Sequence, residues 1–284
     1  MKKVDIDSVQ RIIAEVAAEE IMPRYRKLAA GDIEMKAAND PVTIADKAAE
    51  KRLIERLTLE LPGSVVVGEE SFAEDPGILS RFEGNEAVWV IDPIDGTRNF
   101  VEGVPEFGVM VALVQNLDTV AAWIHDPNTG DTLQGEVGAG VWLSGHKMRL
   151  AARDPSQMQL GIIGSRLKKL LSKPEGVEIL KSLPKLETGS AAAFDYGRLF
   201  SGDVLFAKSS APRASFLLYR QSKPWDHVPG LFLHAETGGY AADFAGKPYN
   251  MQKSLEGLLL APDFEAWQGF IRVFQPFIRN MGIS

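Results

Sequence analysis

The chain has 284 residues, of which 45% are hydrophobic and 24% are charged. This composition is typical of a globular protein, and the length lies where one core tends to split into two. The formal net charge of -7 argues against nucleic acid or an anionic membrane as the main partner. The lack of cysteine excludes disulfides and thiolate metal sites. No apolar run approaches the roughly 18 residues of a membrane span, so we expect a cytoplasmic protein.

The first half of the chain is predicted to form helices followed by a sheet. Apolar residues at helical spacing predict an amphipathic helix over residues 7–28 and a second helix over residues 43–61, which Pro62 and Gly63 end. Short β-type runs separated by Gly, Pro and Asn-rich turns then predict strands at residues 65–68, 87–91, 108–115, 120–125, 132–136 and 141–144.

The second half alternates strands with helices, which is typical of an α/β arrangement. Residues 151–159, AARDPSQMQ, have no helical or strand period and contain Pro155, so they mark a boundary between subdomains at 1–150 and 151–284. Beyond it we expect a strand at 160–163, a helical stretch up to 183, a helix from about 190, a strand near 204–207, a helix after 224 and a closing helix from 264.

Acidic residues follow two of the predicted strands at the point where each strand ends. The run VWVI at residues 88–91 is followed by Asp92 and Asp95, and the run VVVG at 65–68 is followed by Glu69 and Glu70. Gly96 permits unusual backbone angles after the second aspartate, and the next residues can open a helix whose free amides bind an anion. Two strand ends that deliver four acids indicate one shared site.

Clustered carboxylates repel one another unless some are protonated or a cation lies among them. Oxygen ligands without cysteine select hard cations, Mg²⁺ or Mn²⁺, and such ions beside an anion-binding helix start suit phosphoryl transfer to water. The alternative is that these acids are solvated turn residues. A covalent aspartyl-phosphate mechanism needs a partner acid two positions after the nucleophile, and the spacing from Asp92 to Asp95 does not provide it.

Four motifs in order resemble the inositol monophosphatase family: DPVTIAD at 40–46, VGEES at 67–71, WVIDPIDGTRNF at 89–100 and KPWDHVPGLFLHAETGG at 223–239. The resemblance implies a layered α-β-α-β-α sandwich of α+β and α/β type, with the site between the two halves. It also implies a lithium-sensitive phosphatase of small phosphate monoesters that uses two or three Mg²⁺, with Mn²⁺ as a possible substitute, and a homodimer.

Carried over residue by residue, the resemblance implies a set of metal ligands. These are the side chains of Glu69, Asp92, Asp95 and Asp226 and the backbone carbonyl of Ile94. The same resemblance assigns the activation of water either to Glu70 or to Asp46 with Thr97, and leaves both open. It places the phosphate on the amides of Gly96 and Thr97, beside Asp95, and the substrate against Gly189, Ser190 and Ala191.

The substrate is the least defined part of the prediction. Counted back from the Trp-Asp pair of the last motif, Tyr219 stands where inositol-specific enzymes carry a glutamate. Arg220 and Lys223 offer cations that suit a second phosphate or carboxylate. The alternatives to an inositol phosphate are therefore fructose 1,6-bisphosphate, adenosine 3',5'-bisphosphate and histidinol phosphate. A further alternative is a non-enzymatic, metal-binding regulatory protein of the same fold.

Overall fold

A computed structural model describes residues 4–37, 40–150, 160–172, 185–201, 206, 212–221, 223–252 and 256–280. The helices in these ranges are α1 (Ile6–Val16), α2 (Ile44–Glu60), α3 (Glu69–Glu74), α4 (Thr97–Glu102), α5 (Ser165–Leu171), α7 (Ala192–Gly197), α8 (Pro224–Glu236) and α9 (Phe264–Asn280). Short 3-10 turns lie at Ala30–Asp32 and Pro76–Glu83. None of the helices in this described part of the chain is both long and apolar enough to cross a bilayer.

The larger sheet has seven strands in the order β3-β4-β5-β6-β7-β8-β9, of which only β3 and β4 are parallel neighbours. Strands that are consecutive in the chain are neighbours in this sheet, as the short runs separated by turns predict. Its strands are β3 (Val65–Gly68), β4 (Val88–Asp95), β5 (Gly108–Gln115), β6 (Asp118–His125), β7 (Thr132–Glu136), β8 (Gly140–Leu143) and β9 (His146–Lys147).

The smaller sheet has five strands in the order β12-β11-β14-β16-β15, with parallel pairs around β11 and antiparallel pairs around β16. Its strands are β11 (Gly161–Ile163), β12 (Leu186–Thr188), β14 (Phe216–Gln221), β15 (Tyr240–Ala242) and β16 (Glu256–Ala261). Two antiparallel pairs complete the strands: β1 (Ile33–Ala37) with β2 (Asp40–Thr43), and β10 (Arg149–Leu150) with the distant β13 (Phe200–Ser201).

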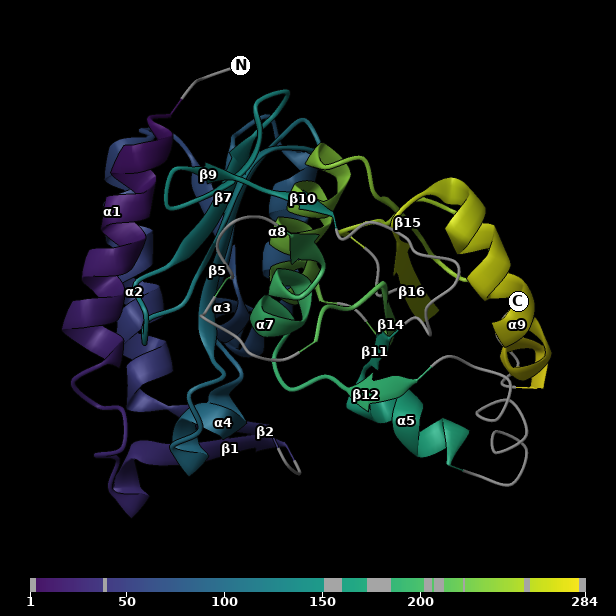
Figure 1. Ribbon diagram of the computed structural model, residues 1–284. Helices are drawn as coiled ribbons and strands as arrows, with labels where there is room; N and C mark the ends of the chain where they lie inside the picture. The colour runs from purple at the N-terminus through teal and green to yellow at the C-terminus, as the bar shows by residue number, and fades with distance from the viewer. Residues whose placement is uncertain are drawn as a thin grey trace.

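Five layers follow from how the strands present alternate side chains. Trp89 and Ile91 of β4 face α1 and α2, whereas Val88 and Val90 face the central helices. Figure 1 shows the resulting order: α1 and α2, the larger sheet, α7 and α8, the smaller sheet, and then α5 and α9. The predicted layered α-β-α-β-α sandwich is therefore confirmed.

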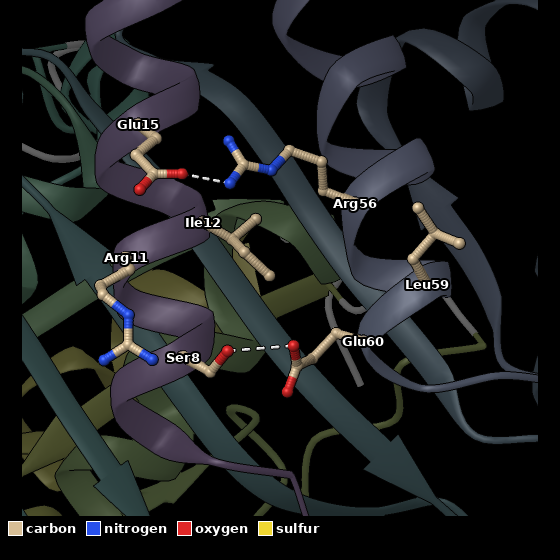
Figure 2. A pocket seen from close by; sticks show the side chains of 7 residues that line it. All are labelled: Ser8, Arg11, Ile12, Glu15, Arg56, Leu59 and Glu60. Carbon is tan, nitrogen blue, oxygen red and sulfur yellow. Dashed lines mark hydrogen bonds and ion pairs between the residues drawn. The ribbon is translucent and has the colours of Figure 1, made fainter.

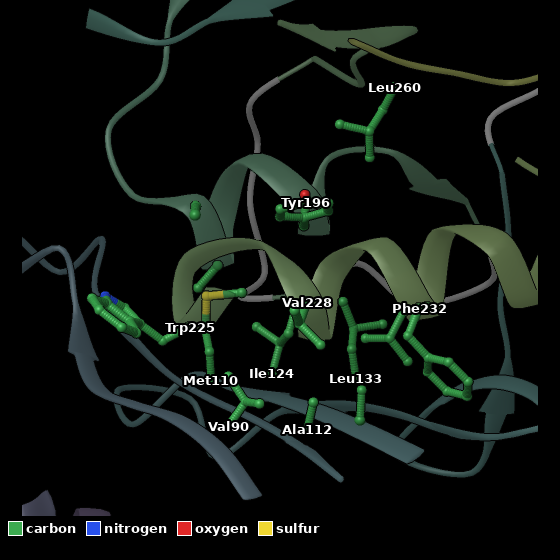
Figure 3. Close-up of a cluster of buried hydrophobic side chains, with 14 of the residues drawn as sticks. Val90, Met110, Ala112, Ile124, Leu133, Tyr196, Trp225, Val228, Phe232 and Leu260 are labelled. Carbon is green, nitrogen blue, oxygen red and sulfur yellow. The ribbon is translucent and has the colours of Figure 1, made fainter. Parts of the chain in front are cut away.

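The central core joins the two sheets through α7 and α8. Val228 of α8 lies against Ile124 and Leu133 of the larger sheet, as Figure 3 shows, while the ring of Trp225 packs on Phe72 of α3. Burying a side chain of this size stabilises the fold by about 1.5–3 kcal/mol. The first turn of α8 also carries Asp226, the acidic residue of the last motif. The packing of α8 therefore fixes the position of Asp226 relative to the larger sheet.

The first helix is shorter than the sequence predicts. Helix α1 ends at Val16, a π-helical turn covers Ala17–Ile21, and turns follow instead of helix up to residue 28. Pro23 has no amide to donate to the preceding turn, so the apolar period alone extends the prediction too far. The helix predicted from about residue 190 begins at Ala192.

Most of the smaller sheet is absent from the sequence prediction. The sequence predicts strand β11 but not the strands at residues 186–188, 216–221, 240–242 and 256–261. These strands are either very short or lack the alternation of apolar and polar residues that identifies a strand. The predicted boundary at 151–159, most of the predicted strand near 204–207 and the helical stretch from 173 to 183 lie outside the described residues.

A surface pocket of about 350 Å³ lies between α1 and α2 (Figure 2). Two contacts join the helices across it: Arg56 pairs with Glu15, and the Ser8 hydroxyl donates to Glu60 at 3.0 Å. On α2, Arg56 and Glu60 follow the acid of the first motif, Asp46, by roughly three to four turns, about 15–21 Å along the axis. This pocket is therefore separate from the acidic site.

Candidate active site

The turn after β4 brings two aspartates and a helix start together. The pairing of β4 with β5 shifts between Asp92 and Asp95, and the amide of Ile94 donates to Asp92 Oδ1 at 3.0 Å. Gly96 then takes a φ of +87°, and α4 begins at Thr97. A Cβ at Gly96 would lie 2.9 Å from a backbone oxygen, so glycine is required for both conformation and space.

The second strand end lies beside the first because β3 and β4 are parallel. Gly68 is paired with Ile91, so the chains that follow both strands leave the same edge of the sheet. Helix α3 begins at Glu69. Asp226 reaches this edge from the first turn of α8, and ligand oxygens of Glu69, Asp92 and Asp226 all lie within 4.8 Å of one another.

The electrostatics of this cluster favour a cation. Burial, followed by the charges of Glu69, Asp95 and Asp226, raises the pKa of Asp92 well above its ordinary value. Burial raises the pKa of Asp95 to about 6, although backbone amides of α7 oppose the shift. Closely spaced carboxyl oxygens with no sulfur or nitrogen ligand among them fit a hard divalent ion.

Lys36 is the residue that the sequence analysis missed at this cluster. It projects from β1, and its Nζ lies 2.9 Å from Glu69 Oε1 and 2.6 Å from Glu70 Oε1. The neighbouring carboxylates raise its pKa despite burial. No local pattern marks this lysine, because β1 reaches the acids only after the β1–β2 pair folds over them.

Glu50 supports the start of α3 from underneath. Its carboxylate accepts hydrogen bonds from the amides of Glu70 and Ser71 at 2.8 and 2.7 Å, and from the Ser71 hydroxyl. A Cβ at Gly68 would approach this carboxylate to 2.6 Å, so the glycine of the second motif makes room for it. Glu50 could have been suspected, because it lies one helical turn after Asp46 on the same face of α2.

Asp46 both caps α2 and contacts the β4–α4 turn. Its Oδ2 accepts from the amide and hydroxyl of Thr43, while its Oδ1 lies 3.1 Å from Thr97 Oγ1. The same Thr97 hydroxyl lies 3.0 Å from the Ile94 carbonyl. Burial raises the pKa of Asp46 to about 6, and burial raises that of Glu70 to about 8 against the opposing effect of Lys36. The pKa of each of these two carboxyls therefore lies above its ordinary value.

The predicted substrate-side residues lie in two places. Residues 189–191 lead into α7, whose Ala193 amide donates to Asp95 Oδ2 at 2.7 Å, so this loop borders the acidic turn. Tyr219 is buried beside α7 and α8, with its hydroxyl on Asp195. Arg220 follows it on β14 and therefore lies on the opposite face of the smaller sheet, the face that packs on α5 and α9.

Lys223 lies over one aromatic ring of α3 and one of α8. Its Nζ is 4.5 Å from the ring of Phe72 on α3 and 5.8 Å from the ring of Trp225 on α8. These two helices also carry Glu69 and Asp226, so this exposed cation stands at the rim of the cluster.

The layered fold has counterparts of known structure. An IMPase from Thermotoga maritima superposes with a TM-score of 0.77 over 96% of this chain and 98% of its own, at 24% identity. An inositol monophosphatase from Zymomonas mobilis gives 0.72 over 95% and 97%, also at 24% identity. These structures share the layered fold of this chain, and the family model that matches its sequence makes it a phosphatase, a phosphoric monoester hydrolase.

Sequence comparison assigns the family. The sequence model of the inositol monophosphatase family matches residues 2–271, and the chain belongs to that family. The chain is 28% identical to a fructose-1,6-bisphosphatase/inositol-1-monophosphatase of Thermotoga maritima over 74% of each protein. It is 29% identical to an inositol monophosphatase of Dictyostelium discoideum over 89% of this chain and 90% of the relative. A protein named Nus factor SuhB of Escherichia coli is 30% identical over 82% and 83%.

Proposed function

We propose that this protein hydrolyses a small phosphate monoester with Mg²⁺ as cofactor and water as nucleophile. The observation that carries the proposal is the convergence of Glu69, Asp92 and Asp226 within 4.8 Å at the edge where α4 begins. Magnesium held by these side chains, with Asp95 and the Ile94 carbonyl, would polarise the phosphate and lower the pKa of the attacking water.

The residues of the β4–α4 turn would bind and orient the reactants. The amides of Gly96 and Thr97 open α4 and would donate to phosphate oxygens. Thr97 and Asp46, which lie in hydrogen-bond contact, would hold the attacking water in line with the phosphorus, and Glu70 is the alternative acceptor of its proton. The P–O bond to the leaving group would break as the new P–O bond forms, and the departing oxygen would take up a proton from solvent to leave as an alcohol.

The leaving group would lie between the loop at 189–191 and the start of α8. The Tyr219 hydroxyl donates to Asp195, and Arg220 lies on the face of β14 that packs on α5 and α9. These positions do not support a direct contact of either residue with the substrate. Lys223 is the better placed cation for a second phosphate or carboxylate. The name of the Thermotoga maritima relative, which combines fructose bisphosphate and inositol phosphate, supports keeping both substrates in the proposal.

The proposal also covers inhibition, metal replacement, assembly and location. It includes inhibition by lithium, replacement of Mg²⁺ by Mn²⁺, a homodimer and a cytoplasmic location. The negative net charge and the lack of cysteine support the absence of a membrane or polyanionic partner and a reducing compartment.

The deciding experiment is phosphate release with and without Mg²⁺ from inositol 1-phosphate, fructose 1,6-bisphosphate, adenosine 3',5'-bisphosphate, histidinol phosphate and glycerol 2-phosphate. We expect magnesium-dependent release with one preferred substrate. The Lys223→Met variant should lose the preference for a bisphosphate if that is the preferred class, and Arg220→Met serves as the matched control.

A second candidate is a metal-binding regulatory protein of the same fold. It is favoured by the several relatives named Nus factor SuhB, among them those of Pseudomonas aeruginosa and Vibrio cholerae. Intact Mg²⁺ binding without turnover of any substrate would support this candidate over the phosphatase.

A further inference from the structure

One of the buried carboxyls outside the proposed metal ligands lies on α7. Asp195, on α7, is 3% exposed, and Tyr219 Oη donates to its Oδ2 at 2.8 Å. The amide of Ser190 points to the other oxygen, Oδ1, at 3.4 Å. Burying a carboxyl costs free energy unless hydrogen bonds offset it. The buried Asp195 carboxyl therefore needs both donors, the Tyr219 hydroxyl and the Ser190 amide.

The carboxylate of Asp195 shapes the loop before α7. A Cβ at Gly189 would come within 2.0 Å of Asp195 Oδ2, so the loop backbone lies directly on this side chain. Tyr219 is fixed in turn, because its ring packs 4.7 Å from the ring of His227 on α8. The loop at residues 189–191 is thus held between its own helix and β14.

The same loop and helix start reach the catalytic turn. The Ala193 amide donates to Asp95 Oδ2, and a Cβ at Gly96 would lie 2.9 Å from the Ala191 side chain. A continuous set of contacts therefore runs from Tyr219 through Asp195 and the start of α7 to the β4–α4 turn. It crosses from the smaller sheet to the larger one.

We propose that Asp195 and Tyr219 form a positioning pair that sets the loop at residues 189–191 against the leaving group and thereby decides which leaving groups the site accepts. This inference rests on the function proposed above. Neither residue touches the phosphate in this scheme. Their effect is transmitted by the backbone of the loop, whose amides and small side chains form the wall on the leaving-group side.

The test uses Tyr219→Phe, which keeps the ring and removes the hydroxyl, and Asp195→Asn, which keeps the shape but presents an amide to one of the two donors. The full-length variants are assayed with the monoester that the wild-type protein prefers. A hydrogen bond to a buried carboxylate contributes about 1.4 kcal/mol, so we expect KM to rise about tenfold. We expect kcat to change by less than about threefold, because the phosphate subsite is intact.

Two further readouts separate positioning from general damage. Inorganic phosphate has no leaving group, so its inhibition constant should stay within about twofold of wild type while KM rises. Amide hydrogen exchange over residues 190–193, which requires no turnover, should accelerate in both variants. A parallel rise of KM and of the phosphate inhibition constant, or unchanged KM and unchanged exchange, would overturn the proposal.

Tyr196→Phe is the matched control. Tyr196 is fully buried on the same helix, and its hydroxyl lies 3.2 Å from His227 Nδ1 rather than on Asp195. We expect a similar loss of thermal stability but a wild-type KM and wild-type exchange at 190–193. If the wild-type protein releases no phosphate from any substrate, the proposed function fails. Amide hydrogen exchange at residues 190–193 then still tests whether Asp195 and Tyr219 hold the loop, and wild-type exchange rates in both variants would contradict this.

Discussion

Lys36 donates from Nζ to Glu70 Oε1 at 2.6 Å, although the two residues lie on separate elements, β1 and α3. The same ammonium group is 2.9 Å from Glu69 Oε1. A positive charge of the protein itself therefore stands at the edge of the proposed metal site. It partly neutralises the acids that a divalent cation would also neutralise.

Replacing this lysine should make the fold depend more strongly on the metal. We expect Lys36→Met to lower the stability of the metal-free protein by about 1–3 kcal/mol, because two carboxylates lose a charged hydrogen-bond donor. Added Mg²⁺ should raise Tm by more in the variant than in the wild type. Lys47→Met is the control, since Lys47 pairs with Glu34 at an exposed site. Equal magnesium-induced shifts in wild type and Lys36→Met would contradict this account.

Asp92→Asn should separate metal binding from folding. The variant removes a carboxyl whose pKa is raised first by burial and then by the neighbouring acidic charges, so its metal-free form should be at least as stable as the wild type. It should lose most of the stabilisation by Mg²⁺ and nearly all phosphate release. Thermal melts with Mg²⁺ or with chelator measure the first effect. Exposed Asp118 provides the control variant Asp118→Asn, and near-normal turnover in Asp92→Asn would rule out the proposed ligand set.

Glu50→Gln should weaken the site without touching the cluster. The carboxylate holds the amides of Glu70 and Ser71, so a neutral amide with one acceptor oxygen leaves a donor unsatisfied. We expect the Mg²⁺ concentration for half-maximal activity to rise about tenfold, in the range found for residues that orient metal ligands. Glu55→Gln, on the exposed face of the same helix, should leave that concentration unchanged. A wild-type magnesium requirement in Glu50→Gln would refute this supporting role.

The stability of the metal-free protein should fall as the pH rises. Burial raises the pKa of Asp46 from 3.8 to about 6 and that of Glu70 from 4.5 to about 8. Between its ordinary and its raised pKa, each group binds more protons in the folded than in the unfolded state, so unfolding becomes more favourable with increasing pH. We expect Tm in chelator to decrease from about pH 5 to about pH 8, and Mg²⁺ to flatten this slope.

The comparison for this pH dependence is Asp46→Asn, which removes one of the buried ionisations. Its Tm in chelator should vary less steeply below about pH 6 than that of the wild type. A Tm that rises with pH over the whole interval would show that the buried carboxyls are not the dominant titrating groups.

Local patterns predicted the parts of the site that lie within a few residues of one another. The turn from Asp92 to Thr97 follows from a buried strand that runs into Pro, Asp and Gly, and the structure has the strand end, the left-handed Gly96 and the helix start in place. The helix predicted over residues 43–61 begins at Ile44, with Thr43 as its N-cap. Backbone geometry and steric limits act over such distances without help from the rest of the fold.

Predictions based on period alone were less complete. The helical spacing of apolar residues predicts a first helix that extends beyond Pro23, although α1 ends at Val16. The strands of the smaller sheet lack the alternation of apolar and polar residues that would predict them. The central strands β14 and β16 are buried on both faces, between α7 and α8 on one side and α5 and α9 on the other, whereas the edge strands β12 and β15 are very short. Burial on both faces removes the alternation that would identify them in the sequence.

The sequence by itself determined the family motifs, the acidic strand ends and the order of most elements of the first half. Only the tertiary structure brought Lys36 to Glu70, Glu50 under α3, and Asp195 to Tyr219. The physical reason is that each of these contacts joins separate layers or elements. Whether such side chains meet depends on how the sheets and helices pack, which no pattern within a single element specifies.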